Sequence, residues 1–196
     1  MTTKHLAAFD SRVDFRVQHG WRVPYCSNML LTDAGTTISA LTRWLSSQSG
    51  GEPIKLEIYA HGALGSTGSP LVMPPPTVRP GSPLSYAHEY YYQIGIGLSS
   101  HNVSSWGRHL QALGRLQKIT FYGCGTYSRY FGAHRHSHEA QRDLLRQLAQ
   151  LCRCPVRYTE DTQQLQIDCA TRQVGGNPLA RPAYEIAPNG TVQTLR

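Results

Sequence analysis

Residues 54–62 read IKLEIYAHG, and residues 116–125 read LQKITFYGCG. Each is a short apolar run with β-branched and aromatic residues that ends in a glycine-containing turn, which predicts a buried strand. His61 and Cys124 directly follow these two strands. Because ligand sites in parallel sheets form beyond the carboxyl ends of the strands, we expect both side chains at one edge of the sheet.

Segments with helical spacing of apolar residues lie between the predicted strands. Thr36 or Thr37 can cap a helix that contains Ile38, Leu41, Trp44 and Leu45 and ends at 49–53. The same reasoning predicts helices over 103–113 and 138–152, and strands over 12–19, 89–96, 155–158, 165–167 and 184–186, with a turn at 188–190. This alternation predicts an α/β fold with a mostly parallel central sheet and helices on both faces.

The length of 196 residues fits a single domain, for which we predict a core over about 12–158 and a C-terminal extension over 159–196. Residues 62–85 are rich in Gly, Ser and Pro, so they are not expected to form a regular helix or a central strand. A loop of this length is often functional, and a plain surface excursion is the alternative.

Composition limits the possible partners and compartments. The formal net charge is +7, but the basic residues are scattered with no run of four, which favours a basic surface over a nucleic-acid footprint. No apolar run reaches the length of about 18 residues needed to span a membrane. The N-terminus lacks the pattern of a secretory signal, which predicts a cytoplasmic protein, with export by a signal-independent route as the alternative. The odd number of cysteines, five, favours free thiols.

The predicted placement of Cys124 and His61 permits nucleophilic catalysis without a cofactor. A thiolate attacks a carbonyl, and a neighbouring imidazole can take the thiol proton. The backbone amides of Gly62 and Gly125 can donate to the developing oxyanion. These parts suit amide or peptide hydrolysis, whereas a buried cysteine that packs as a small hydrophobic residue is the structural alternative.

The segments IYAHG (58–62) and ITFYGCG (119–125) resemble the caspase-like cysteine peptidase superfamily, which includes caspases and clostripain- and gingipain-type peptidases. The resemblance implies a caspase-like fold, Cys124 as nucleophile, His61 as general base and acid, and a peptide or protein substrate. The pentapeptide that surrounds the cysteine in true caspases is absent. Because several branches of the superfamily are inactive, a catalytically silent binding module of a toxin, defence or signalling assembly is the alternative.

In this superfamily, the loops after the cysteine strand and after the next strand shape the specificity pocket. The corresponding loops here are 125–137 and 159–168, and the second contains Glu160, Asp161 and Asp168. An acidic pocket would select arginine or lysine before the cleaved bond, and solvated loop carboxylates are the alternative.

Two further clusters have a metal or redox interpretation. His134, His136 and His138 would face one side only in an extended segment, so a solvated polar loop is favoured over a Zn²⁺ or Cu²⁺ site. Cys152 and Cys154 enclose a single residue at the end of a predicted helix, where a core position is favoured over metal or redox chemistry. We therefore predict no metal site.

Overall fold

The computed structural model describes most of the chain outside the long central loop. The described residues are 2–11, 13–33, 36–60, 63–64, 70–71, 98, 102–123, 135–159, 165–175, 179 and 182–195, with only the backbone at 63–64, 70–71 and 135–140.

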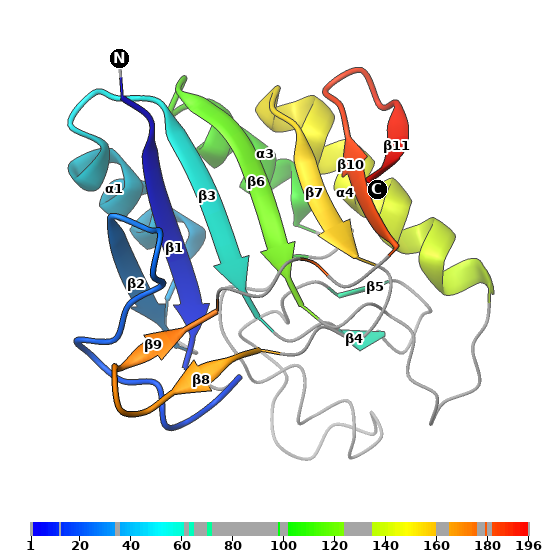
Figure 1. Cartoon of the computed structure of the whole chain (residues 1–196). Helices are drawn as coiled ribbons and strands as arrows, with labels where there is room; N and C mark the ends of the chain where they lie inside the picture. Colours follow the sequence, from blue (N-terminus) through cyan, green and yellow to red (C-terminus); the bar gives the residue numbers. More distant parts are fainter. Residues whose placement is uncertain are drawn as a thin grey trace, which may run out of the picture.

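A seven-stranded mixed sheet forms the centre of the described structure (Figure 1). Its strands are β1 (Lys4–Asp10), β2 (Asn28–Thr32), β3 (Ile54–Tyr59), β6 (Leu116–Tyr122), β7 (Val156–Thr159), β10 (Ala183–Ile186) and β11 (Val192–Leu195). Their order is β11-β10-β7-β6-β3-β1-β2, and the segment from β7 to β2 is parallel. Strand β10 runs antiparallel to both of its neighbours. The predicted α/β fold with a mostly parallel sheet is confirmed.

Three helices cover one face of this sheet, and all three lie behind it in Figure 1. They are α1 (Ile38–Ser49), α3 (Val103–Gln111) and α4 (Arg135–Cys152). Their apolar side chains and alternate strand residues form the larger core cluster, which includes Leu56, Ile58, Ile119, Phe121, Leu41, Leu45, Trp106, Leu110, Leu145 and Leu148. Helices on both faces are thus not seen within the described ranges.

Helix α1 begins and ends where its sequence predicts. The Thr37 side chain accepts a hydrogen bond from the Ala40 amide at 3.1 Å, which satisfies one of the free N–H groups of the first turn. Gly50 follows the helix with φ of 57°, a left-handed conformation that favours glycine. Helix α4 begins at Arg135, three residues before its predicted start, so residues 135–137 are helical rather than loop.

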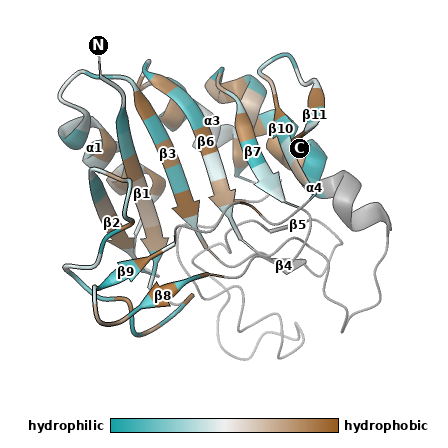
Figure 2. Ribbon diagram, viewed as in Figure 1, coloured by the Kyte–Doolittle hydropathy of each residue, from teal (hydrophilic) through white to brown (hydrophobic). Residues whose placement is uncertain are grey.

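The opposite face of the sheet is covered in part by irregular chain. Residues 13–27 and the hairpin of β8 (Ile167–Asp168) and β9 (Gln173–Val174) lie beside the carboxyl end of β1 in Figure 1. A second apolar cluster joins them to the sheet and includes Phe9, Tyr59, Val17, Val23 and Val174. Figure 2 shows hydrophobic and hydrophilic bands that alternate along the strands, as expected where the two faces have different cover.

The predicted strand over 12–19 is wrong. The Val13 amide donates to the Asp10 carbonyl and the Val17 amide to the Asp14 carbonyl, so this segment consists of turns. Arg16 donates to the Asp14 carboxylate from both its backbone and its side chain, and these local bonds replace the ladder of a sheet. The first strand is instead β1, which precedes this segment.

Two short additional features complete the description. Strands β4 (Ala63–Leu64) and β5 (Pro70–Leu71) pair antiparallel outside the main sheet. Strands β10 and β11, from the predicted C-terminal extension, lengthen the central sheet: β10 pairs with β7, and β11 pairs with β10. Their hairpin contains the predicted turn at 188–190, where Gly190 has φ of 86° and its amide donates to the Ala187 carbonyl.

Candidate functional site

The carboxyl ends of β3 and β6 lie side by side. Tyr59 and Tyr122 are partners in the parallel register, and the Ala60 amide donates to the Tyr122 carbonyl at 3.2 Å. The predicted adjacency of these two strands is therefore confirmed. His61 and Cys124 each come two residues after this pair, and they, Gly62 and Gly125 lie outside the described residues.

Buried polar residues end the strands on either side of this pair. Asp10 ends β1, Thr32 ends β2 and Thr159 ends β7, and each is at most 2% exposed. The Thr32 hydroxyl donates to the Phe9 carbonyl and the Thr159 hydroxyl to the Pro182 carbonyl, both at 3.3 Å. Buried polar groups need such partners. These bonds fix the chain where it leaves the sheet, at the edge where parallel sheets form ligand sites.

A tyrosine cluster lies on the sheet face opposite the helices, next to the ends of β3 and β6. The rings of Tyr59 and Tyr122 stack with centroids 4.6 Å apart and planes within 6° of each other. The Tyr59 hydroxyl donates to Glu57 Oε2 at 2.7 Å and lies 3.2 Å from the hydroxyl of Tyr25. Gly175, which directly follows β9, packs against this cluster. A Cβ at this position would lie 2.7 Å from the Tyr59 hydroxyl oxygen, so a larger residue would displace the tyrosine.

Burial dominates the electrostatics of this cluster. It raises the pKa of the Glu57 carboxyl, although hydrogen bonds from Tyr59 and Tyr25 act in the opposite direction. Burial is also the largest cause that raises the pKa of the Tyr59 and Tyr122 hydroxyls. Burial, followed by the charge of Glu57, raises the pKa of the Cys26 thiol, so this cysteine is a poor nucleophile. The cluster therefore serves as a buried, hydrogen-bonded support rather than as a source of a thiolate.

Sequence reasoning missed this cluster as a unit. The alternation of the stretch 54–59 does place Glu57 and Tyr59 on one face of a strand. Tyr25, however, comes from an irregular segment with no periodic signal. Its approach to Tyr59 is a tertiary contact that local sequence does not predict.

The acidic candidates for a specificity pocket are only partly described. Glu160 and Asp161 lie outside the described residues. Asp168 is exposed, and its carboxylate accepts hydrogen bonds from the amides of Ala170 at 2.9 Å and Thr171 at 3.2 Å. Hydrogen bonds from Thr171 are the main cause that lowers the pKa of this carboxyl. In the structure, Asp168 thus holds the turn between β8 and β9.

The histidine cluster does not have the extended geometry that a metal site of this spacing requires. His134 lies outside the described residues, whereas His136 and His138 belong to helix α4. Residues two apart on a helix are separated by about 200° around its axis, so the helical backbone at 136 and 138 does not supply the extended conformation that puts alternate residues on one side. Within the described part of the chain, no group of three His, Cys, Asp or Glu residues is arranged to hold a metal ion.

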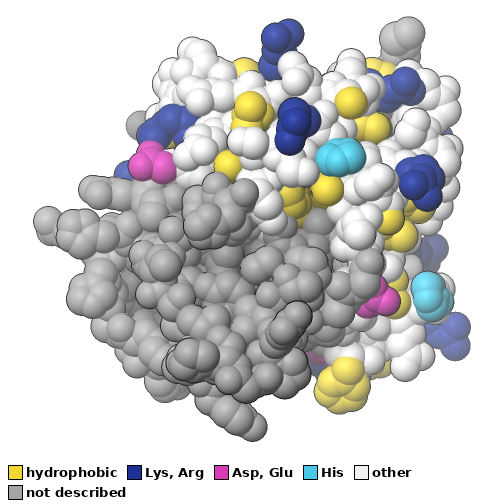
Figure 3. All heavy atoms as spheres, turned by 180° about the vertical axis from the view of Figure 1, so that it is seen from behind, with side chains coloured by type: hydrophobic (Ala, Val, Ile, Leu, Met, Phe, Trp, Pro, Cys, Tyr) yellow, Lys and Arg dark blue, Asp and Glu magenta, His cyan; other side chains and the backbone are white. Residues whose placement is uncertain are grey.

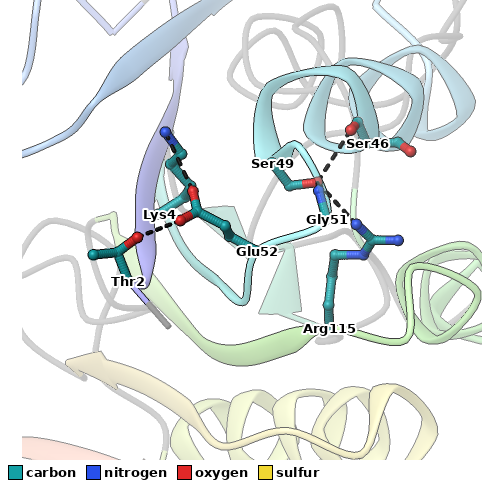
Figure 4. Close-up of polar contacts among 7 residues, drawn as sticks. All are labelled: Thr2, Lys4, Ser46, Ser49, Gly51, Glu52 and Arg115. Carbon is teal, nitrogen blue, oxygen red and sulfur yellow. Dashed lines mark hydrogen bonds and ion pairs between the residues drawn. The ribbon is translucent and has the colours of Figure 1, made fainter.

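Polar contacts at the opposite edge of the sheet have a structural role (Figure 4). Glu52 pairs with Lys4 at 3.3 Å and accepts a hydrogen bond from Thr2, which joins the end of α1 to β1. Ser49, fully buried, accepts a hydrogen bond from Arg115 at 3.3 Å, which joins α1 to the start of β6. These bonds connect elements of the fold and leave the carboxyl edge as the candidate site.

On the side of the helices, the described residues form no concentrated basic patch. Figure 3 shows Lys and Arg side chains distributed over the described part of this face rather than gathered together. This distribution agrees with the scattered basic residues of the sequence. Among the described residues, no helix has the length and apolar character needed to cross a membrane.

Comparison with protein-family models, curated proteins and solved structures finds no match to this chain. The basis for a functional assignment is therefore the arrangement of the sheet and the residues at its carboxyl edge.

Proposed function

We propose that the chain is a cysteine-dependent peptide or amide hydrolase with Cys124 as nucleophile and His61 as general base. The observation that supports it is the register of β3 and β6, in which Tyr59 pairs with Tyr122. Side chains two residues apart on a strand share a face. If each strand kept its register for two more residues, His61 and Cys124 would be neighbours on the face of this tyrosine pair.

The chemistry of the proposal follows from these residue types. The Cys124 thiolate attacks the carbonyl carbon of the scissile amide, and the thiol proton passes to His61. The imidazolium then gives this proton to the leaving amine, which leaves an acyl-enzyme for water to hydrolyse. Backbone amides of Gly62 and Gly125 stabilise the oxyanion, a contribution that is commonly worth several kcal/mol. Glu160, Asp161 and Asp168 favour a basic residue before the cleaved bond.

A peptide-library assay tests the proposal. The purified chain is incubated with a mixture of peptides that vary at every position, and new termini are identified by mass spectrometry. We expect cleavage after arginine or lysine, and a loss of at least about a thousandfold in the rate for Cys124→Ala and for His61→Ala. Circular dichroism verifies that each variant is folded.

Matched controls make this assay specific. Cys169 is exposed and lies in the β8–β9 turn, and His19 lies in the irregular segment after β1, so Cys169→Ala and His19→Ala should retain the activity of the natural chain. Full activity of Cys124→Ala would remove the assignment of the nucleophile. Cleavage after acidic or apolar residues would remove the acidic pocket alone. A complete lack of cleavage, together with an iodoacetamide-resistant Cys124, would favour the silent binding module.

A further inference from the structure

Two buried thiols meet where helix α4 passes into strand β7. Cys152 is the last residue of α4, and Cys154 precedes β7. Both belong to the core cluster on the helix face, with 6% and 1% of the residue exposed. Their sulfur atoms are 3.3 Å apart, which is about 1.3 Å more than the length of a disulfide bond.

The backbone between the two cysteines brings their side chains together. Arg153 has φ of 55°, one of only two non-glycine residues of the described chain in the left-handed region. A residue in a helical conformation of either hand keeps its neighbours' Cα atoms about 5.4 Å apart. Disulfides form at Cα separations of about 4.4–6.8 Å. The left-handed residue Arg153 ends helix α4 and also gives a spacing that suits a bond between its two neighbours.

We propose that Cys152 and Cys154 form a reversible disulfide site that reacts with hydroperoxides. This inference is independent of the proposed hydrolase activity. It rests on the separation of the two sulfur atoms and on the left-handed turn between the two cysteines. Cys152 is the more exposed of the two residues, so the proposal makes it the one that meets hydrogen peroxide.

The reaction balances as a two-electron oxidation. The Cys152 thiolate attacks one peroxide oxygen, so an S–O bond forms, the O–O bond breaks and hydroxide leaves as water after protonation. The Cys154 sulfur then attacks the Cys152 sulfur, the S–S bond forms, and the S–O bond breaks to release a second water that carries the Cys154 proton. Two thiols are oxidised to a disulfide, and one peroxide is reduced to two waters.

The polar surroundings of the two sulfurs assign these roles. A hydrogen bond from Cys154 is the largest cause that lowers the pKa of the Cys152 thiol, and this bond and burial both raise the pKa of Cys154. The Cys152 sulfur also lies 3.8 Å from the Ala149 carbonyl, which fixes its position at the helix end. Because Cys152 is also the more exposed of the two residues, we assign it as the attacking thiol and Cys154 as the resolving one.

Peptide mapping of the full chain tests this site. The reduced protein is treated with a small excess of hydrogen peroxide, and then remaining thiols are blocked with N-ethylmaleimide under denaturing conditions. Trypsin cleaves after Arg146, Arg153 and Arg157, so the disulfide would join peptides 147–153 and 154–157. If the ring protects Arg153 from trypsin, peptide 147–157 appears intact and two hydrogens lighter. We expect one of these products to form and to disappear after treatment with dithiothreitol.

Two variants and one internal comparison decide the outcome. In Cys154→Ser, the resolving thiol is missing, so Cys152 should stop as a sulfenic acid that dimedone traps. Cys169→Ser, a change at an exposed cysteine, should leave the linked peptides unchanged. Recovery of both Cys152 and Cys154 as N-ethylmaleimide adducts, while Cys169 in the same molecules is oxidised, would overturn the proposal. This comparison uses the unchanged chain, so it holds even if a variant fails to fold.

Discussion

Glu57 places a carboxyl group on a central strand, where only 9% of the residue is exposed. The Tyr59 hydroxyl donates to it at 2.7 Å, but burial has the larger effect and raises its pKa. The folded protein therefore binds this proton more tightly than the unfolded chain does. The ordinary pKa of a glutamate carboxyl is about 4.5, and the pKa of Glu57 in the folded protein is higher. The stability that the protonated form contributes is therefore lost as the pH rises from the first value through the second.

Replacement Glu57→Gln should remove this pH dependence, because the amide keeps the shape and the acceptor oxygen but does not titrate. We expect the free energy of unfolding of the natural chain, relative to that of the variant, to fall between pH 4 and pH 8. Urea denaturation at several pH values measures this difference. A difference that stays constant across this range would mean that Glu57 titrates equally in both states.

Glu185 provides a control of opposite sign. Burial raises the pKa of its carboxyl, but the hydrogen bond from Arg157 and the charges of Arg157 and Lys118 outweigh it and lower the pKa. Stability from this group is present above the unfolded pKa and is lost as the pH falls through the folded value. The difference between the natural chain and Glu185→Gln should therefore grow as the pH rises toward about 4.5, the ordinary pKa, and level off above it.

At the level of elements, the contact between α3 and α4 depends on Gly107. This buried glycine lies within α3, where glycine costs about 1 kcal/mol relative to alanine. A Cβ at this position would lie 2.3 Å from Leu151 Cβ of α4, too close for two carbon atoms. The missing side chain allows the two helices to approach each other.

Gly107→Ala should therefore destabilise the protein despite its better helix propensity. Overpacking commonly costs about 1–3 kcal/mol, so we expect a net loss of about 1 kcal/mol in the free energy of unfolding. Urea denaturation measures the change. Ser104→Ala, on the exposed side of the same helix, should be neutral or slightly stabilising. A Gly107→Ala variant as stable as the natural chain would show that the helices separate at little cost.

Most elements with a clear local signal were predictable. The periodic apolar residues predict α1, α3 and α4, and the apolar runs predict β3, β6 and β7, all of which are present. Strand β1 was not predicted, because its apolar run, Leu6 to Phe9, is only four residues long and contains two alanines, which are uncommon in strands. Residues 13–19 do alternate, but the carboxylate of Asp14 satisfies local donors and favours turns.

For the molecule as a whole, β1, β3 and β6 are each hydrogen-bonded on both sides, whereas β11 is an edge strand. Local opening requires the loss of fewer contacts at an edge than at the centre. We expect backbone amides of β1 and β3 to exchange with deuterium last, and those of β11 and the two-residue ladder of β8 and β9 to exchange first. Mass spectrometry of peptic fragments measures this order. Equal protection of β11 and β3 would indicate that the edge is stabilised by contacts beyond the sheet.

The candidate site was predictable only to the level of its strands. The sequence predicts that the strands before His61 and Cys124 are neighbours, and the register of β3 and β6 confirms this. The distance between the two side chains falls outside the described residues. The cover contributed by Tyr25 and Gly175 was not predictable, since both come from irregular segments whose position depends on contacts distant in sequence.

Helices pack on one side of the central strands, and irregular chain or solvent lies on the other. This difference has an evolutionary consequence. Ile58 packs in the core beneath the helices, while Lys55 on the same strand points to the opposite side and is only partly buried. Substitutions at Ile58 must conserve the volume of the side chain, because it packs in the core. Substitutions at Lys55 need only keep the surface soluble. Diverging descendants of this chain would therefore change Lys55 more freely than Ile58, whereas Glu57 and Tyr59, on the same side as Lys55, stay constrained by burial and by their mutual hydrogen bond.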